Sequence, residues 1–163
     1  MAYPVIIQGR YGDEKVTSST KKNRIGARMV LPDGSEFVYA YAGEAITAGK
    51  VTMQAQTASD HIKDLAVAAA VSAGATQLTV TNGGSTAITA SSSYTGTGTA
   101  VGTYEDGYLF VNDADGEGQA WSIKNHSAAS TGATITINLF DTDKVATALT
   151  TSSQVGLLKN PHN

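Results

Sequence analysis

The chain has 163 residues, no cysteine, 15% charged residues and a formal net charge of −3. This length suits one domain, or one domain with an arm, that buries a core without cross-links, and the lack of cysteine excludes disulfides, thiolate metal sites and cysteine nucleophiles. The longest weakly apolar run, 65–75, is mostly alanine and too short for a membrane span, and residues 1–15 lack a signal-peptide pattern. We therefore expect a soluble protein, made in a cytoplasm, with no membrane contact.

Charge is divided unevenly along the chain. Residues 1–28 contain six basic and two acidic residues, a net charge of +4, whereas residues 29–163 contain five lysines and twelve carboxylates, a net charge of −7. The basic residues of the first segment are Arg10, Lys15, Lys21, Lys22, Arg24 and Arg28. Because residues 12–24 show no apolar periodicity, the sequence predicts a basic arm over 1–28, with a short extended segment at 3–8, followed by a domain over 29–163.

The first part of this domain predicts extended structure. Residues 28–41 contain two apolar runs around Pro-Asp-Gly at 32–34, which is typical of a hairpin with a tight turn. Another short strand is expected within 45–55. Residues 61–73 fit both a helical stripe and strand alternation, and the β context on both sides favours the extended form.

The second half alternates more clearly. In residues 76–90, Leu78 and Val80 face one side of a strand, and Asn82-Gly83 is the signal for a type I′ hairpin turn. Farther along, the sequence predicts a polar loop at 91–103, paired strands at 107–111 and 119–125 with Trp121 and Ile123 on the core face, a strand at 134–141 with Ile135, Ile137 and Leu139 inward, and a last strand at 154–158. Many short strands joined by turn signals predict an all-β fold, a single β-sandwich or barrel-like domain of short antiparallel strands with an extended N-terminal arm.

The stretch "VNDADGEGQAW" at 111–121 places three carboxylates around two glycines. Asp113, Asp115, Glu117 and Gly118 match positions 1, 3, 5 and 6 of a calcium loop, but position 12 is Lys124, a cation where a bidentate glutamate is needed. A glycosidase pair of Asp113 and Glu117 is also disfavoured, because carboxylates crowded on a glycine-rich turn keep ordinary acidity. The stretch therefore predicts a tight turn rather than a metal or catalytic site.

Other patterns of enzyme chemistry are missing from the sequence. His61, His126 and His162 lack metal-ligand spacing, and His61 between Asp60 and Asp64 is interpreted as part of a solvated turn. There is no Gly-x-Ser-x-Gly elbow and no Gly-x-x-x-x-Gly-Lys phosphate loop. We therefore predict no catalytic residue, metal ion or cofactor, and do not expect an enzyme.

The basic cluster of the arm has three readings. Such a cluster is most often a solvated face, and it can also be a protein-docking arm. A nucleic-acid contact needs aromatic side chains for stacking, but the nearest ones are Tyr11 and Phe37, and the acidic domain would repel phosphates. Nucleic acid is therefore not an expected partner.

Three segments resemble virion proteins of tailed bacteriophages. They are "LPDGSEFVYAYAGEAITAGKV" (31–51), "AGATQLTVT" (73–81) and "DGYLFVNDADGEGQAWSIKNHSAASTGATITINL" (106–139), and the final "VGLLKNPHN" is similar to the same group. Together these segments cover most of residues 30–163. The resemblance implies a capsid-associated structural protein, a head decoration or cement protein, with no catalytic residues.

On this resemblance the chain is expected to bind the major capsid protein on the outer surface of the virion, after synthesis in the host cytoplasm. It would reinforce contacts between capsid subunits as a homo-oligomer, most naturally a trimer at a local threefold axis. The six basic residues would then form a capsid-binding arm that becomes ordered on contact. The alternative is a carbohydrate-binding adhesion module of a virion fibre or tail, in which Trp121 or Tyr104 stacks on a sugar ring.

Overall fold

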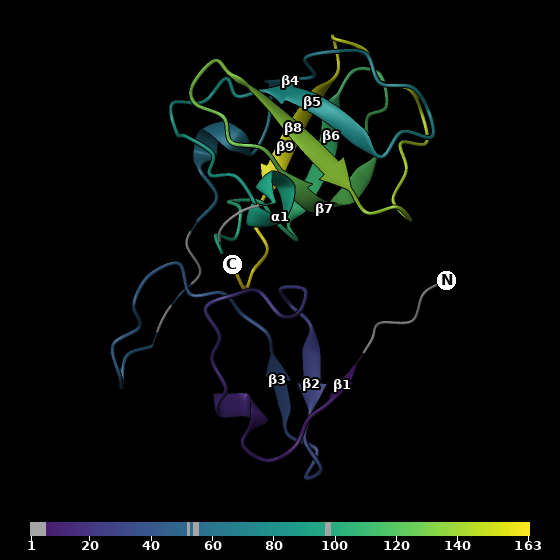
Figure 1. The fold of residues 1–163 in the computed structure, drawn as a ribbon. Helices are drawn as coiled ribbons and strands as arrows, with labels where there is room; N and C mark the ends of the chain where they lie inside the picture. Colours follow the sequence, from purple (N-terminus) through teal and green to yellow (C-terminus); the bar gives the residue numbers. More distant parts are fainter. Residues whose placement is uncertain (1–5, 52, 54–55, 97–98) are drawn as a thin grey trace. The chain divides into compact units, whose positions relative to one another are not determined.

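The structure is a computed structural model that describes residues 6–51, 53, 56–96 and 99–163. The chain forms two compact units, which Figure 1 draws as ribbons. We call Met1–Gln54 together with Pro161–Asn163 the sheet unit, and Ala55–Asn160 the barrel unit. The last three residues belong to the sheet unit because the Tyr41 backbone N–H donates to the His162 carbonyl at 2.9 Å.

The sheet unit contains a small three-stranded sheet in the order β1-β2-β3. Its strands are β1 (Ile7–Gln8), β2 (Arg28–Val30) and β3 (Glu36–Val38), and the 3-10 helix η1 (Asp13–Lys15) lies between β1 and β2. β1 runs parallel to β2, and β2 runs antiparallel to β3. The hairpin predicted at 28–41 is confirmed, and Gly34 takes the positive φ of 84° that suits its turn.

The two units divide after Gln54, whereas the sequence placed the boundary after Arg28. The physical reason is β1. Because β1 pairs with β2, the hairpin of β2 and β3 belongs to the same unit as the N-terminal residues. A parallel pairing between distant segments leaves no local pattern in the sequence, so the boundary could not be seen there.

The barrel unit confirms the all-β prediction. It contains the 3-10 helix η2 (Ser59–His61), the single helical turn α1 (Ser92–Thr95), and six strands: β4 (Leu65–Ala66), β5 (Gln77–Thr81), β6 (Tyr108–Asp113), β7 (Ala120–His126), β8 (Thr134–Leu139) and β9 (Gln154–Leu158). The strands form one antiparallel sheet in the order β4-β9-β6-β7-β8-β5. Val67, next to β4, bridges Val80 in β5, so the sheet nearly closes into a barrel.

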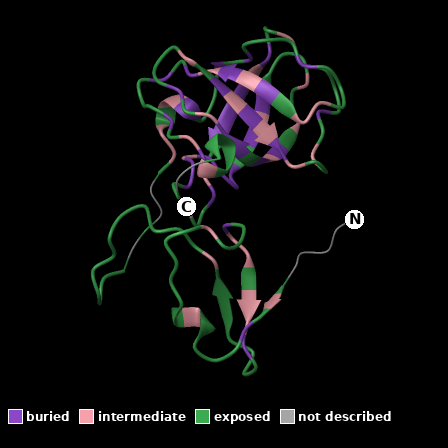
Figure 2. Ribbon diagram, viewed as in Figure 1, coloured by how far each residue is buried: buried purple, intermediate pink, exposed green. Residues whose placement is uncertain are grey.

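The hydrophobic core lies inside this barrel. Of 22 buried hydrophobic residues among those described, all except Ile25 and Leu31 belong to the barrel unit. Figure 2 shows the same contrast, with buried residues concentrated on the barrel strands. Strict alternation along β8 buries its apolar side chains, as predicted, and Trp121 and Ile123 on β7 also face inward. Period-two alternation therefore identified the core faces of these strands correctly.

The hairpin predicted at 76–90 is wrong. β5 pairs with β8, far along the chain, and no strand follows it before α1. Asn82 and Gly83 do not take the positive φ of a type I′ turn. Instead the Asn82 side chain is buried, and its amide donates to the Thr86 carbonyl at 3.0 Å inside the barrel unit.

The remaining expectations have mixed outcomes. Residues 61–73 are extended at β4 and at the bridge of Val71 with Leu149, so the extended interpretation is confirmed there. The paired strands around 111–121 and the last strand are confirmed as β6, β7 and β9. The strand expected within 45–55 is not seen at 45–51 or 53, and its other residues lie outside the described part, as do 3–5 of the first extended segment. No helix among the described residues has the length and apolar character needed to cross a bilayer.

Candidate functional site

The six predicted arm residues all lie in the sheet unit, between β1 and the start of β2. Five are exposed and Lys21 is half-buried. Lys15 and Arg28 form ion pairs within the unit: Lys15 Nζ lies 3.9 Å from Glu14 Oε1, and Arg28 pairs with Glu36. The Lys22 backbone N–H donates to the Tyr39 hydroxyl at 3.0 Å, which ties this segment to the end of β3. The basic side chains therefore lie on the surface of a folded segment of the sheet unit.

The sheet unit also contains most of the exposed large apolar side chains of the described residues. Of thirteen exposed large hydrophobic side chains among the described residues, nine belong to this unit: Ile6, Tyr11, Val16, Phe37, Val38, Tyr41, Ile46, Val51 and Met53. Val51 and Met53 are 96% and 90% exposed. The unit that contains the six basic residues therefore also leaves most of these large apolar side chains available for contact with another protein. We call this unit's exposed apolar and basic side chains the docking face.

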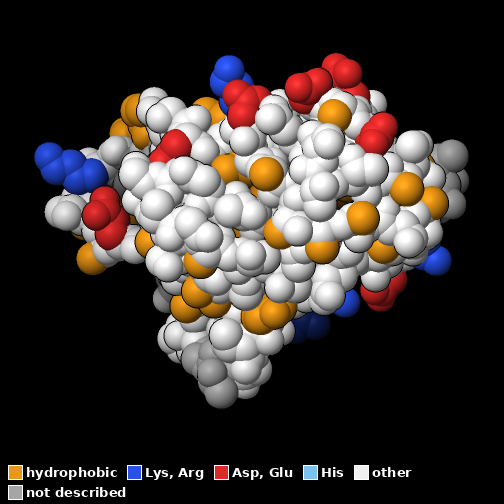
Figure 3. All heavy atoms as spheres, turned by 90° about the horizontal axis from the view of Figure 1, so that it is seen from above, with side chains coloured by type: hydrophobic (Ala, Val, Ile, Leu, Met, Phe, Trp, Pro, Cys, Tyr) orange, Lys and Arg blue, Asp and Glu red, His pale blue; other side chains and the backbone are white. Residues whose placement is uncertain are grey.

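The acidic stretch lies in the barrel unit. Figure 3 shows one face of the molecule, with hydrophobic side chains scattered over it and charged side chains mainly near the edges of the view. The acidic stretch forms a turn between β6 and β7, as predicted, with positive φ at Ala114, Gly116 and Gly118. The Gln119 side chain holds this turn to the loop before β9, donating to the Thr147 carbonyl at 3.0 Å and accepting from the Thr147 N–H at 2.9 Å.

The carboxylates of the acidic turn are used locally. Asp113 Oδ1 accepts from the Ala114 N–H at 2.8 Å, and Asp115 Oδ2 accepts from the Thr150 hydroxyl at 3.0 Å. Lys124 lies near Asp141 instead, with 3.9 Å between Nζ and Oδ1. Within the described ranges, no group of three or more histidine and acidic side chains is placed to hold a metal ion. These contacts explain the turn without any ligand.

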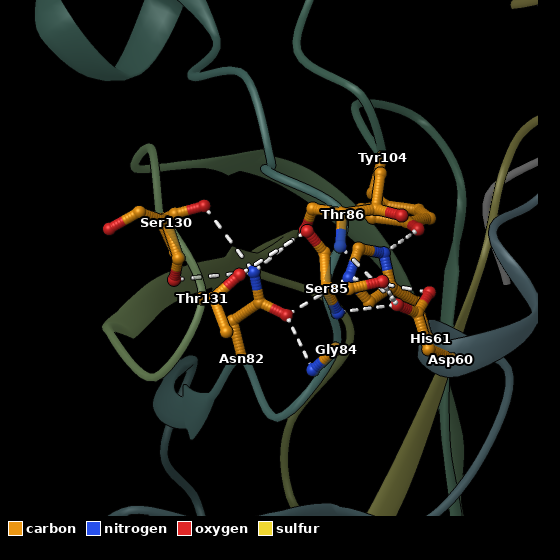
Figure 4. Close-up of polar contacts among 10 residues, drawn as sticks. Asp60, His61, Asn82, Gly84, Ser85, Thr86, Tyr104, Ser130 and Thr131 are labelled. Carbon is orange, nitrogen blue, oxygen red and sulfur yellow. Dashed lines mark hydrogen bonds and ion pairs between the residues drawn. The ribbon is translucent and has the colours of Figure 1, made fainter.

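The prediction that His61 lies in a solvated turn is wrong. The sequence suggested a solvated turn, but the His61 side chain is fully buried, because two polar partners from distant segments surround it. Its Nδ1 lies 2.6 Å from the Tyr104 hydroxyl, and its Nε2 lies 2.9 Å from Asn82 Oδ1 (Figure 4). Since Asn82 Oδ1 can only accept, Nε2 carries the proton and the Tyr104 O–H donates to Nδ1.

A second buried histidine contacts the same tyrosine. His126 Nε2 accepts from the Tyr104 backbone N–H at 3.0 Å, and its Nδ1 donates to the Ser127 carbonyl at 2.9 Å. Burial lowers the pKa of His126, and burial together with the charge of Asp60 raises the pKa of Tyr104. His61 is hydrogen-bonded to the side chains of Tyr104 and Asn82, whereas His126 is hydrogen-bonded to the Tyr104 backbone, and all four residues are buried. We call His61, Asn82, Tyr104 and His126 the buried polar network.

Asp60 lies at the edge of this network. Its Oδ2 accepts from the Ser85 N–H at 2.6 Å, the Ser85 hydroxyl at 3.1 Å and the Thr86 N–H at 3.3 Å. Partial burial alone would raise the pKa of Asp60, but these hydrogen bonds outweigh it and hold the pKa below its ordinary value. These three hydrogen bonds hold the loop 82–86 against Asp60.

The buried polar network also bears on the sugar-binding alternative. Tyr104 and Trp121 are both buried, and the Trp121 indole N–H donates to the Lys144 carbonyl at 3.1 Å. Neither ring has a face open to a sugar, so the residues that would carry this alternative are not accessible.

Comparison of the chain with protein-family models, with curated proteins and with solved structures found no match.

Two groups of residues escaped the sequence analysis. The members of the buried polar network are 21 to 43 residues apart in their contacts, and no local spacing announces such a network. The apolar part of the docking face did leave a signal. Val16, Ile46, Val51 and Met53 are large apolar residues in polar or glycine-containing segments without alternation, which is the pattern of apolar side chains that have no core of their own to join.

Proposed function

We propose that the chain is a structural virion protein that binds the assembled capsid of a tailed bacteriophage and reinforces contacts between major capsid subunits. The observation that carries this proposal is the docking face: nine exposed large apolar side chains among the described residues of the unit that also contains the net charge of +4 of residues 1–28. The motifs that resemble virion proteins give the kind of partner. The outer capsid surface is the location that such a role requires.

The two units fit a division of labour in this role. The barrel unit has a well-filled core, and no buried side-chain nitrogen or oxygen of the described residues lacks a hydrogen-bond partner. In this role it would serve as a rigid body. The sheet unit, with only two buried hydrophobic residues among those described, gains most from being covered by another protein.

Reinforcement follows from binding equilibria. A protein that binds the assembled shell and not its separated subunits stabilises the shell by RT ln(1 + [L]/Kd), about 2.7 kcal/mol per site at a hundredfold excess over Kd. Because a capsid repeats the site many times, modest contacts are sufficient. Oligomeric copies bind more tightly, since linked copies act at a high effective concentration.

The test uses shells of the phage that encodes the chain, prepared without this protein. The purified full chain is added, and bound protein is measured by co-sedimentation and its position by electron microscopy. The double variant Val51→Ser and Met53→Ser removes two almost fully exposed side chains and leaves the fold intact, so we expect at least a tenfold loss of affinity. Tyr94→Ser, which changes an exposed side chain of the barrel unit, is the matched control. Shells that bind neither the native chain nor the control refute the proposal.

The basic residues are tested separately. Lys21→Glu with Lys22→Glu reverses two charges of the arm, and Lys63→Glu with Lys124→Glu reverses two charges of the barrel unit. We expect the first pair to weaken shell binding more than the second, and the difference to shrink as salt is raised. Equal effects of both pairs would show that the arm does not contact the shell.

A further inference from the structure

β3 is an open edge of the small sheet. It pairs with β2 on one side, and the described residues place no strand on its other side. All three residues of β3 are exposed, and two of them, Phe37 and Val38, are large and apolar. An edge strand presents unpaired N–H and C=O groups, to which another strand can pair.

Hydrogen bonds at both ends of β3 show which backbone groups point outward. The Leu31 N–H donates to the Ser35 carbonyl at 2.9 Å, and the Tyr39 N–H donates to the Ala27 carbonyl at 2.8 Å. Since backbone groups of an antiparallel strand alternate in direction, residues 35, 37 and 39 face β2. The N–H and C=O groups of Glu36 and Val38 therefore point to the open edge.

We infer that β3 pairs antiparallel with β3 of a second copy of this chain, around a twofold axis at Phe37. Phe37 then lies opposite Phe37 of the second copy, and Glu36 lies opposite Val38 of the second copy. This register uses the outward N–H and C=O groups of both strands and joins two three-stranded sheets into one of six strands. An antiparallel pair of identical strands is self-complementary, as a twofold interface requires.

Side chains on one face of the sheet support a second copy of the chain as the pairing partner. Ile7 lies beside Met29, and Met29 lies beside Phe37, so three apolar side chains form a row across the sheet unit. The pairing continues this row through the second copy to six side chains. Phe37 occupies a position without direct hydrogen bonds to its counterpart, where opposed residues approach most closely and aromatic pairs contribute most.

Charge on the other face also favours a second copy over a charged partner. Arg28 and Glu36 form an ion pair within each copy, so the edge carries no net charge of its own. In the inferred register Glu36 meets Val38 of the second copy rather than another carboxylate, so no like charges are directly opposed. A neutral strand with apolar residues is the complementary partner, and β3 is such a strand.

The pairing is short, and this sets its strength. Three residues on each side bury far less than the roughly 1,200 Å² of a stable interface, so the dimer is weak in solution and forms mainly at high local concentration. The inference does not depend on shell binding. It also differs from the trimer implied by the resemblance, because a twofold axis gives a dimer.

Cross-linking tests the register directly. The chain has no cysteine, so Phe37→Cys introduces its only thiol. Opposed residues at this kind of position have Cα atoms about 4.5 Å apart, within the range of a disulfide. We expect the oxidised full chain to form a covalent dimer at least ten times faster through Phe37→Cys than through Val38→Cys, which lies on the same strand but opposite Glu36. Val51→Cys, which is exposed in the same unit, reports the rate of random collision.

Sedimentation equilibrium up to ~1 mM protein gives the second measurement. We expect the average mass of the native chain to rise from 16.8 kDa toward twice that value. Val38→Pro removes an outward N–H and no bond to β2, and proline is tolerated on an edge strand, so this variant stays monomeric. Equal cross-linking at all three positions, a monomeric native chain at the highest concentration, or a trimer would each overturn the inference. Shell binding by Val38→Pro is a separate readout and decides the proposed function independently.

Discussion

Tyr104→Phe removes one oxygen atom from the centre of the buried polar network. Tyr104 is almost fully buried, and its hydroxyl donates to His61 Nδ1 at 2.6 Å. The ring itself still fills the same space, so no cavity of importance is created. The change deletes one hydrogen bond and leaves the buried Nδ1 of His61 as an acceptor without a donor.

The size of the effect follows from that unpaired acceptor. Leaving a buried polar group unsatisfied costs about 1–3 kcal/mol, more than the net value of an ordinary hydrogen bond. For a unit of about 100 residues, a loss of 2 kcal/mol lowers the melting temperature by about 8–16 °C. With a urea dependence of about 1–3 kcal/mol per molar, the midpoint falls by about 1 M.

Trp121 provides the assay. It is the only tryptophan in the chain and lies in β7 of the barrel unit, so its fluorescence reports the unfolding of this unit. Tyr108→Phe is the matched control, because Tyr108 is 46% exposed on β6 and loses only a solvated hydroxyl. We expect the control to match the native chain within about 0.5 kcal/mol. If Tyr104→Phe unfolds at the same urea concentration as the control, the hydrogen bond to His61 does not stabilise the barrel as argued.

Three further predictions concern the same unit. Burial lowers the pKa of His126, although the charge of Glu105 acts in the opposite direction. As pH falls, His126 is therefore protonated in the unfolded chain before it is protonated in the folded chain. The free energy of unfolding then decreases below the ordinary pKa of 6.5, by at most about 1.4 kcal/mol per pH unit. Urea midpoints between pH 7.5 and 5.5 measure this, and His126→Gln flattens the profile. Gly156→Ala places a Cβ against the Ile62 carbonyl oxygen and costs about 1–3 kcal/mol by urea unfolding, whereas Gly83→Ala, with open space, is nearly neutral. The pKa of Asp60 is lowered in the folded chain, so the ionised Asp60 stabilises the fold, and this contribution is lost as pH falls below 3.8. We expect the free energy of unfolding of Asp60→Asn to decrease less in this pH range than that of the native chain.

Local patterns predicted the strands better than their partners. Alternation along Ile135, Ile137 and Leu139 gives the buried face of β8 without any structure, because side chains of a strand point alternately to its two faces. It does not tell which strand lies next to β8. Its neighbours are β5 and β7, and β5 lies more than fifty residues earlier in the chain. Asn82-Gly83 was misread as a turn for this reason, since its local signal competes with a long-range pairing.

Burial of polar residues was the least predictable feature. His61 lies between Asp60 and Asp64, and this sequence context favours solvent. The structure buries it because Asn82 and Tyr104 supply partners to both ring nitrogens. A buried polar group is tolerated when its hydrogen bonds are complete, and that condition depends on residues far away in the sequence. The acidic turn, in contrast, was predicted correctly because glycine positions and local carboxylate contacts determine it.

The two units differ in what a partner could add to them. Fully burying a large apolar side chain gains about 1.5–3 kcal/mol, so Val51 and Met53 together offer about 3–6 kcal/mol on contact. Ordering a flexible residue costs about 1–2 kcal/mol, so this gain balances the ordering of only a few residues. A contact that holds the sheet unit must therefore use several of its nine exposed side chains, or backbone pairing such as that at β3, in addition to charge. The barrel unit needs no such help, because its own core already contains the apolar side chains that stabilise it.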